Sequence, residues 1–339
     1  MVQTSYGGPE VVHLQDVGQP QPGSEDLLVQ VGACGLNRLD VLQRRGPGVL
    51  PNFSLPHIGG MDIAGTVVGI GSDVTGRQLG ERVVVDPTQG CGSCPRCQVG
   101  DRGYCSQLRV LGGNAPGGLA EFVAVRADTT VGIPDDVALD EAAALPTAWA
   151  TAWHAVHAAG RAMPGECVVV QAGASALSLA TIQLLRHLGS KVIAVASSER
   201  KLAAARAAGA DLGIANDGQL SAAVQDFTQG RGADLVIDHV GAATWEASLG
   251  CLGIGGRIVL LGNTSGDRVS FSLADVFHRG LRLIGAGGYT AADFSSAMLT
   301  CFQAGLRMPA AAQFVLDDLP LAWASVESRE TVGKVIVLL

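Results

Sequence analysis

Two uninterrupted apolar runs, separated by an amphipathic segment, dominate the centre of the chain. The runs cover residues 168–170 and 192–195, and the segment 179–188 repeats apolar residues at helical spacing before Gly189. Strands without polar alternation are typical of a parallel sheet that is covered on both faces. We therefore expect a right-handed strand–helix–strand crossover of about 30 residues here.

The pattern of the remaining chain predicts a β-rich part and a mixed α/β part. Up to about residue 125, Gly and Pro separate short apolar segments, which predicts strands at 27–32, 65–70 and 82–86. Further strands are expected at 235–239, 257–261, 281–285 and 335–339. Helices are expected at 139–158 (interrupted at Pro146), 201–208 and 244–252. The fold class predicted is α/β, a doubly wound parallel sheet with a β-rich companion domain.

The turn after the first apolar run consists of small residues. Such a turn lets a diphosphate approach the N-terminus of the following helix, where free N–H groups and the helix dipole favour anions. A dinucleotide site usually has Gly-x-Gly-x-x-Gly, whereas this turn has Gly173, Ser175 and Ser178 at those positions. An ordinary crossover that binds no nucleotide therefore remains open from the turn alone.

Size and charge narrow the class of protein. A chain of 339 residues predicts two domains, and a formal charge of −8 without a basic run argues against nucleic acid as a partner. No apolar run reaches about 18 residues, and the first residues lack a secretory pattern, so we expect no membrane span. A cytoplasmic protein that acts on a small molecule is the expectation.

Four of the eight cysteines, Cys91, Cys94, Cys97 and Cys105, lie in one short segment. Four thiolates in one loop are typical of tetrahedral Zn(II) with closed coordination, which is structural and not catalytic. Two disulfides or free thiols are the alternatives, and the dispersed remaining cysteines do not resemble a secreted disulfide framework.

The order of landmarks along the whole chain resembles the medium-chain dehydrogenase/reductase superfamily. The landmarks are the cysteine segment and residues 8–11, 118–123, 151–153, 209–211 and 333–335. The resemblance implies a GroES-like substrate domain, built from both termini around a Rossmann domain, with a nicotinamide cofactor in the cleft. The expected domains are 1–148 with 287–339, which includes the zinc lobe 91–105, and 149–286.

Within this superfamily, the active centre distinguishes two branches. Where zinc alcohol dehydrogenases have metal ligands, this chain has Asn37, Met61 and the pair Pro146-Thr147. Asn37-x-x-Asp40 and Gly60-x-Asp62-x-x-Gly65 resemble the quinone oxidoreductase-like branch, which lacks the catalytic metal, and specifically members that keep the zinc lobe. The resemblance makes Asn37, Asp40 and Asp62 the catalytic candidates.

Cys34, His57 and Asp62 form a possible alternative metal site, since a thiolate, an imidazole and a carboxylate are sufficient ligand types. The other interpretation is that Cys34 is a small buried residue and that His57 caps the loop after Pro56.

The end of the second Rossmann strand predicts the cofactor. NAD-specific folds place a carboxylate there, whereas this chain has Ser197 and Ser198, followed by Glu199 in a helix start and then Arg200 and Lys201. Hydroxyls and cations favour a 2′-phosphate, hence NADPH, although Arg200 and Lys201 are alternatively a solvated first turn. The expected cofactor-binding residues are Thr151, Gly173, Ser175, Ala176, Leu177, Ser178, Ser197, Ser198, Lys201, His239, Val240, Leu261, Gly262 and Asn263.

These features predict an NADPH-dependent oxidoreductase that transfers hydride to a quinone or an activated C=C bond without a catalytic metal. A zinc-dependent alcohol or aldehyde dehydrogenase and a non-catalytic NADPH-binding protein are the alternatives. The apolar run 281–285 would be the edge strand of the Rossmann sheet, and an exposed edge invites pairing, so a homodimer is expected.

Overall fold

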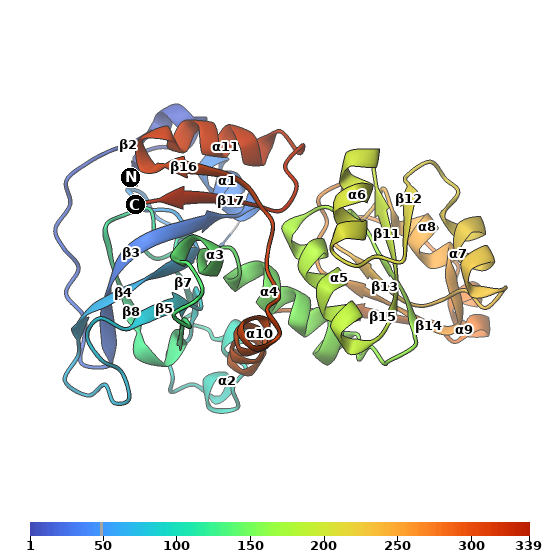
Figure 1. Cartoon of the computed structure of the whole chain (residues 1–339), viewed down its shortest axis with the longest axis horizontal. Coiled ribbons are helices and arrows are strands. Elements are labelled where there is room, and N and C mark those ends of the chain that lie inside the picture. Colours follow the sequence, from blue (N-terminus) through green and yellow to red (C-terminus); the bar gives the residue numbers. More distant parts are fainter. Residues whose placement is uncertain (48–49) are drawn as a thin grey trace. The chain divides into compact units, whose positions relative to one another are not determined.

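A computed structural model describes residues 1–47 and 50–339. Its contacts group the chain into two compact units (Figure 1). The first unit comprises Met1–Ala150 and Thr290–Leu339, and the second comprises Thr151–Tyr289. None of the helices in the described residues combines the length and apolar character needed to cross a membrane.

The second unit is built on a six-stranded parallel sheet in the order β12-β11-β10-β13-β14-β15. The strands are β10 (Cys167–Val170), β11 (Lys191–Ala196), β12 (Leu212–Ala215), β13 (Ala233–Asp238), β14 (Leu252–Leu260) and β15 (Arg282–Gly285). The strand order reverses between β10 and β13, and ligands of such sheets bind beyond the carboxyl ends of the strands at this point. The doubly wound parallel sheet predicted from the apolar runs is confirmed.

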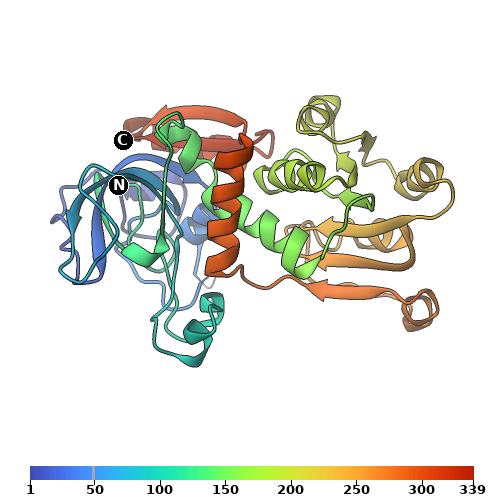
Figure 2. The ribbon, with the colours of Figure 1, turned by 60° about the horizontal axis from the view of Figure 1, so that its bottom comes forward.

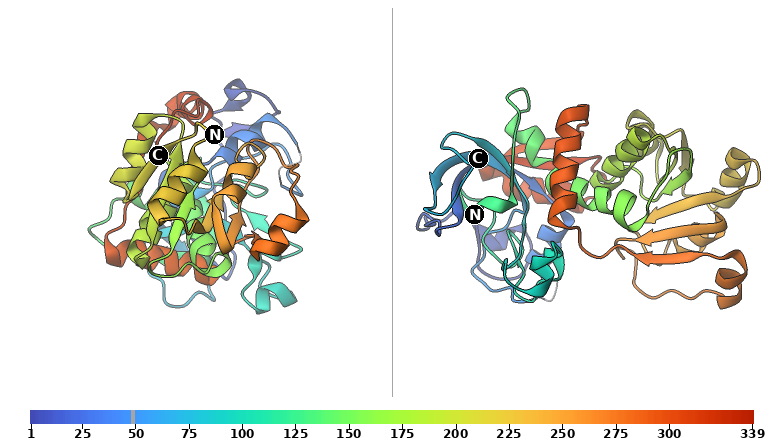
Figure 3. Two further views of the ribbon diagram at one scale, coloured as in Figure 1. Left: turned by 90° about the vertical axis from the view of Figure 1, so that its right-hand side faces the viewer. Right: turned by 90° about the horizontal axis from the view of Figure 1, so that it is seen from below.

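Helices connect these strands. They are α5 (Ala176–Leu188), α6 (Glu199–Ala207), α7 (Leu220–Thr228), α8 (Trp245–Gly250) and α9 (Leu273–Arg279), with the π-helical turn η4 (His154–Ala159) ahead of the sheet. Figure 3 (right) shows α9 projecting at one end of the unit, past the strands. The pattern analysis did not anticipate β12. Because that strand has only four residues, one of them Gly213, it is too short to give a periodic signal.

The first unit contains a seven-stranded sheet in the order β16-β17-β3-β4-β5-β9, with β8 also paired to β3. The strands are β3 (Asp26–Leu36), β4 (Asp62–Ile70), β5 (Arg82–Val85), β8 (Phe122–Arg126), β9 (Thr130–Gly132), β16 (Ala310–Val315) and β17 (Lys334–Leu338). The C-terminal β17 pairs antiparallel with β3, and these red and blue strands lie side by side in Figure 1. Segments from both ends of the chain thus build one sheet, as the resemblance implied.

Short elements complete the first unit. The helices are α1 (Arg38–Arg45), α2 (Pro95–Gln98), α3 (Leu139–Ala143), α4 (Pro146–Trp153, which runs into the second unit), α10 (Ala291–Ala304) and α11 (Leu319–Glu327). The single turns η1 (Pro9–Val11), η2 (Arg102–Tyr104), η3 (Ala127–Thr129) and η5 (Leu316–Asp318) and the strands β1 (Val2–Gln3), β2 (Val12–His13), β6 (Thr88–Gln89) and β7 (Arg109–Val110) are the rest. Figure 2 shows the teal segment with α2 extending away from the sheet.

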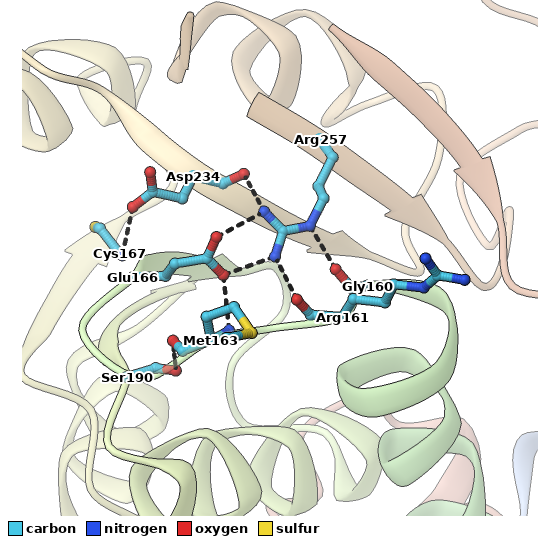
Figure 4. A network of polar contacts seen from close by, with 8 residues as sticks. All are labelled: Gly160, Arg161, Met163, Glu166, Cys167, Ser190, Asp234 and Arg257. Carbon is cyan, nitrogen blue, oxygen red and sulfur yellow. Dashed lines mark hydrogen bonds and ion pairs between the residues drawn. The ribbon is translucent and has the colours of Figure 1, made fainter. Parts of the chain in front are cut away.

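A buried arginine of β14, Arg257, joins the residues at the starts of β10 and β13 to the loop at 160–161 (Figure 4). Arg257 donates from both terminal nitrogens to the carboxylate of Glu166, at 3.0 and 2.6 Å. Its three remaining N–H groups go to the carbonyl oxygens of Gly160, Arg161 and Asp234. A guanidinium has five N–H donors, so this side chain has none left for a ligand.

Candidate functional site

Asp62, at the start of β4, is fully buried, and four hydrogen bonds surround its carboxylate. Oδ1 accepts from the backbone N–H of Thr147 at 3.0 Å and from the Thr147 hydroxyl at 2.5 Å. Oδ2 accepts from Nδ2 of Asn37 at 3.0 Å and from Nζ of Lys334 at 2.5 Å. A carboxylate offers about four lone-pair positions, and these four hydrogen bonds use them, so Asp62 holds its neighbours in place.

Asn37 lies between the cation and the carboxylate of this cluster. Its Oδ1 accepts from Lys334 Nζ at 2.6 Å, while its Nδ2 donates to Asp62. Asn37 is half-buried, whereas Lys334 is only 2% exposed. Thr147 is half-buried too, but its hydroxyl donates to Asp62, so the amide of Asn37 is the half-buried side chain of the Asn37–Asp62–Thr147–Lys334 cluster with a second N–H to offer a ligand.

Asp40, in the first turn of α1, is bound to the backbone beside this cluster. Its two carboxylate oxygens accept from the backbone N–H of Asn37 at 2.7 Å and of Gly60 at 3.1 Å. Burial raises the pKa of Asp40 to about 7, and these hydrogen bonds oppose the rise only in part. The three catalytic candidates, Asn37, Asp40 and Asp62, are thus brought together in the first unit.

Cys34 and His57, two of the alternative metal ligands, have other surroundings in the structure. Cys34 is fully buried in β3, and burial raises the pKa of its thiol well above the usual range. His57 Nε2 lies 3.0 Å from the carbonyl oxygen of Gly112, and Met61 is buried where zinc alcohol dehydrogenases have a ligand histidine. Among the described residues, the cysteine segment forms the only cluster of three or more His, Cys, Asp or Glu with metal-binding proximity.

The sulfur atoms of Cys91, Cys94, Cys97 and Cys105 all lie within 4.8 Å of one another. A tetrahedral zinc with Zn–S bonds of about 2.3 Å needs sulfur atoms about 3.8 Å apart, so the four residues fit that metal. Backbone N–H groups of Ser93 and Cys94 face Cys91 and lower the pKa of its thiol to about 6, which favours the thiolate that a metal needs.

The N-terminus of α5 in the second unit offers unpaired backbone donors. Ser175 caps the helix and accepts from the N–H of Ser178, while the N–H groups of Ala176 and Leu177 have no partner within the described chain. A Cβ at Gly173 would approach Ala194 Cβ to 2.9 Å, so only glycine allows the close packing here. The turn fits a diphosphate despite its departure from the usual glycine pattern.

The two serines that replace glycines contact a histidine. His239 Nε2 lies 3.2 Å from Ser175 Oγ and 3.0 Å from Ser178 Oγ. Because the Ser178 hydroxyl donates to the carbonyl oxygen of Gln171, its oxygen accepts from His239, which places a proton on Nε2. Burial lowers the pKa of His239, so the neutral ring is favoured.

The remaining cofactor candidates lie at the carboxyl ends of strands or in α4. Ser197 and Ser198 follow β11 and are exposed, and Lys201 Nζ donates to Ser197 Oγ at 3.3 Å. Glu199 pairs with Arg206 on the same helix. Val240 follows β13; Leu261, Gly262 and Asn263 follow β14; and Thr151 lies in α4.

Two members of the Asn37–Asp62–Thr147–Lys334 cluster had no expected role. Lys334 and Thr147 were noted only as landmarks, although a lone lysine among the apolar residues of a terminal strand indicates a buried partner. Which carboxylate that partner is depends on the pairing of β17 with β3, which no local pattern contains.

Comparison with known proteins identifies two family models along the chain. Residues 23–135 match the family model "Alcohol dehydrogenase GroES-like domain", and residues 176–304 match "Zinc-binding dehydrogenase". Quinone oxidoreductase-like protein 2 of Rattus norvegicus is 31% identical over 96% of this chain and 88% of its own length. Acryloyl-coenzyme A reductase of Sulfurisphaera tokodaii is 26% identical over 96% of this chain and 95% of its own length.

A solved structure described as an NAD-dependent alcohol dehydrogenase superposes with a TM-score of 0.95. It is 33% identical and covers the whole of this chain and 98% of its own. Sequence relatives and structural neighbours are thus dehydrogenases and reductases that match along nearly the full length. The chain belongs to the medium-chain dehydrogenase/reductase superfamily and is an NAD(P)H-dependent oxidoreductase.

Proposed function

We propose that this protein reduces a conjugated acceptor, an enone, enoyl thioester or quinone, with NADPH and without a catalytic metal. The observation that carries the proposal is the cluster in which Asn37 and Thr147 are bound to Asp62 and Lys334. By the resemblance, Asn37, Met61 and the pair Pro146-Thr147 stand where zinc alcohol dehydrogenases bind their metal, and Lys334 lies against Asn37 and Asp62. The similarity to an acryloyl-coenzyme A reductase and to a quinone oxidoreductase-like protein supports the same class of acceptor.

The reaction places new negative charge on an acceptor oxygen. Bound NADPH would supply the hydride and be left as NADP⁺. In an enone the hydride joins the β-carbon, the C=C electron pair moves toward the carbonyl oxygen, and water then protonates the α-carbon. Asn37 donates a hydrogen bond to that oxygen, while Asp40 and Asp62 hold the amide in position.

The preference for NADPH rests on the end of β11. Ser197, Ser198 and Lys201 offer hydroxyls and a cation, and Glu199, which follows the serines, is paired with Arg206. The unpaired N–H groups of Ala176 and Leu177, together with Ser175, Ser178 and His239, would hold the diphosphate. Gly173 would allow its close approach, with Thr151, Val240, Leu261, Gly262 and Asn263 beside the remainder of the cofactor.

The cysteine lobe would hold one structural zinc, which crosslinks a segment with little apolar core of its own.

We also propose a homodimer that pairs β15 edge to edge, since β15 is bonded on one side only among the described strands and lies at the margin of the sheet (Figure 2). Leu273 and Phe277 of the adjoining α9 are 76% and 73% exposed. Light scattering at micromolar concentration should give twice the chain mass, and a strict monomer contradicts this.

A zinc-dependent alcohol dehydrogenase is the second candidate, favoured by the name of the structural neighbour with the TM-score of 0.95. Such an enzyme needs a second zinc, with Cys34, His57 and Asp62 as the ligands to mutate. About one zinc per chain by elemental analysis supports the reductase, and two zincs per chain support the dehydrogenase.

The deciding experiment compares NADPH oxidation by the zinc-loaded protein with an enone, a quinone and a simple aldehyde. We expect turnover with the conjugated acceptors, little with the aldehyde, and no effect of chelators that spare the cysteine lobe. Asn37→Ala is the matched variant and should lower kcat/KM for the enone by about 100-fold. Alcohol oxidation that is lost on mild chelation would contradict the proposal, and NADPH binding without any turnover would indicate a non-catalytic protein.

A further inference from the structure

Lys334 is a buried cation in a strand that is otherwise apolar. Its Nζ donates to Asp62 and Asn37, and its side chain is 3% exposed. An ammonium group loses much hydration free energy on burial, so it is tolerated only with a partner. Asp62 is that partner, but pairing alone does not require the second contact, to the amide of Asn37.

The strand opposite makes room for this lysine. A Cβ on Gly35 of β3 would lie 2.9 Å from Cε of Lys334 and 2.4 Å from the carbonyl oxygen of Ala143. Any larger residue would therefore displace the lysine stem. Because Gly35 has no side chain, the stem of Lys334 can pass it and place Nζ against the amide oxygen of Asn37.

The cluster fixes which way the amide of Asn37 points. Its oxygen faces the Lys334 ammonium at 2.6 Å, and its nitrogen faces the Asp62 carboxylate at 3.0 Å. In the reversed orientation, NH₂ would face NH₃⁺ and the amide oxygen would face a carboxylate, so both contacts would be repulsive. Lys334 and Asp62 therefore act on the two ends of one amide.

This orientation leaves one N–H bond of the Asn37 amide available to a ligand. The NH₂ group of Asn37 has two N–H bonds, and one goes to Asp62. In residues 1–47 and 50–339 the second has no partner, and Asn37 is the more exposed of the two donors. A buried ammonium on the carbonyl side of an amide also polarises it and strengthens the N–H as a donor.

We infer that Lys334 is a positioning residue for catalysis, which orients and polarises Asn37 so that its free amide N–H binds the oxygen on which negative charge develops. This inference rests on the proposed function, because it concerns the oxygen of the same conjugated acceptor. It assigns Lys334 no direct contact with substrate. Asp62 neutralises the ammonium, and Asp40 and Cys34 are the other titratable groups facing the cluster.

Binding of an oxyanion tests the inference without turnover. The probes are 4-nitrophenolate, at a pH at which it is ionised, and its uncharged isostere 4-nitrotoluene, each titrated into the zinc-loaded protein with NADP⁺. The wild type should prefer the phenolate. Lys334→Met should lose about 10-fold or more of that preference, with nitrotoluene binding unchanged, and Lys334→Arg should restore part of it.

Combining variants separates positioning from direct contact. If Lys334 acts through Asn37, the Asn37→Ala/Lys334→Met pair should bind phenolate no more weakly than Asn37→Ala alone. Lys191→Met removes an exposed lysine of the second unit and is the matched control. The double variant Asp62→Asn/Lys334→Met leaves no unpaired buried charge, so it provides a folded protein if the single variant is unstable.

Three outcomes would overturn the inference: equal weakening of both probes, additive effects of the two substitutions, or a phenolate preference that survives Lys334→Met. The enone assay is read separately. Absence of enone reduction by the wild type contradicts the proposed function, whereas the probe titrations alone decide the role of Lys334.

Discussion

The buried Arg257–Glu166 cluster of the second unit and the buried Lys334–Asp62 cluster of the first unit differ in how many of their N–H donors are paired. Arg257 has five N–H donors, and all five reach an acceptor from Glu166 or the backbone. Within residues 1–47 and 50–339, Lys334 and Asn37 each keep an N–H without a partner beside Asp62. A cluster in which every N–H donor has an acceptor can contribute only to stability. A cluster with an unpaired N–H donor can also bind a ligand.

The largest expected effect is on stability, at the Arg257–Glu166 cluster. Arg257→Met leaves Glu166 without its partner and exposes three carbonyl groups to an apolar side chain. Removing one partner of a buried ion pair costs about 3–5 kcal/mol, so the free energy of unfolding should fall by that amount in urea titrations. Activity per folded molecule should not change, and a loss of kcat without a loss of stability would break the comparison.

Lys334→Met should lower both stability and activity. Asp62 keeps three of its four donors, from Asn37 and Thr147, but it loses its cation while fully buried, so the free energy of unfolding should again fall by about 3–5 kcal/mol. The loss of enone kcat per folded molecule is what should distinguish this variant from Arg257→Met. A stability loss equal to that of Arg257→Met, with unchanged kcat, would show that both clusters are structural.

Asp40 should make stability depend on pH. The folded protein holds its proton up to a pKa of about 7, whereas the unfolded chain releases it near 3.8. Between these values the folded state binds more protons, so stability falls as pH rises, by at most about 1.4 kcal/mol per pH unit, and then levels off. Denaturant titrations of Asp40→Asn between pH 4 and 8, roughly spanning both values, should lack this fall; an unchanged slope would contradict the assignment.

The smallest effect on stability is expected at an exposed cation. Lys201 donates to Ser197 at the surface, so Lys201→Ala should change the free energy of unfolding by no more than about 0.5 kcal/mol. It should still weaken NADPH binding by about 1–3 kcal/mol and leave NADH binding unchanged, because only NADPH has a 2′-phosphate. Isothermal titration with both cofactors measures this, and equal losses would indicate a different contact.

Local patterns were sufficient for much of the second unit. The runs at 168–170 and 192–195 became the central strands β10 and β11, because bilateral burial in a parallel sheet leaves a continuous apolar signal. The short β12 was not predicted, because four residues that include a glycine give no detectable hydrophobic periodicity. The cysteine spacing likewise predicted a cluster that the folded chain forms.

The candidate active site was predictable only in part. Asn37, Asp40 and Asp62 were identified by resemblance of short motifs, and the fold places them together. Their connections were not predictable, because the carboxylate of Asp62 is held by Thr147 and by Lys334, 85 and 272 residues away in sequence.

The sequence by itself determined the α/β class, the central crossover, the cysteine cluster and the residue types that replace the metal ligands. Each of these depends on hydrophobic periodicity or on short residue spacings, which can be read from the linear sequence. Only the tertiary structure decided that Lys334 pairs with Asp62, that Gly35 makes room for it, and that Arg257 has no donor to spare. The physical reason is that hydrogen-bond saturation is a property of all neighbours at once, and strand pairing across nearly the whole chain supplies those neighbours.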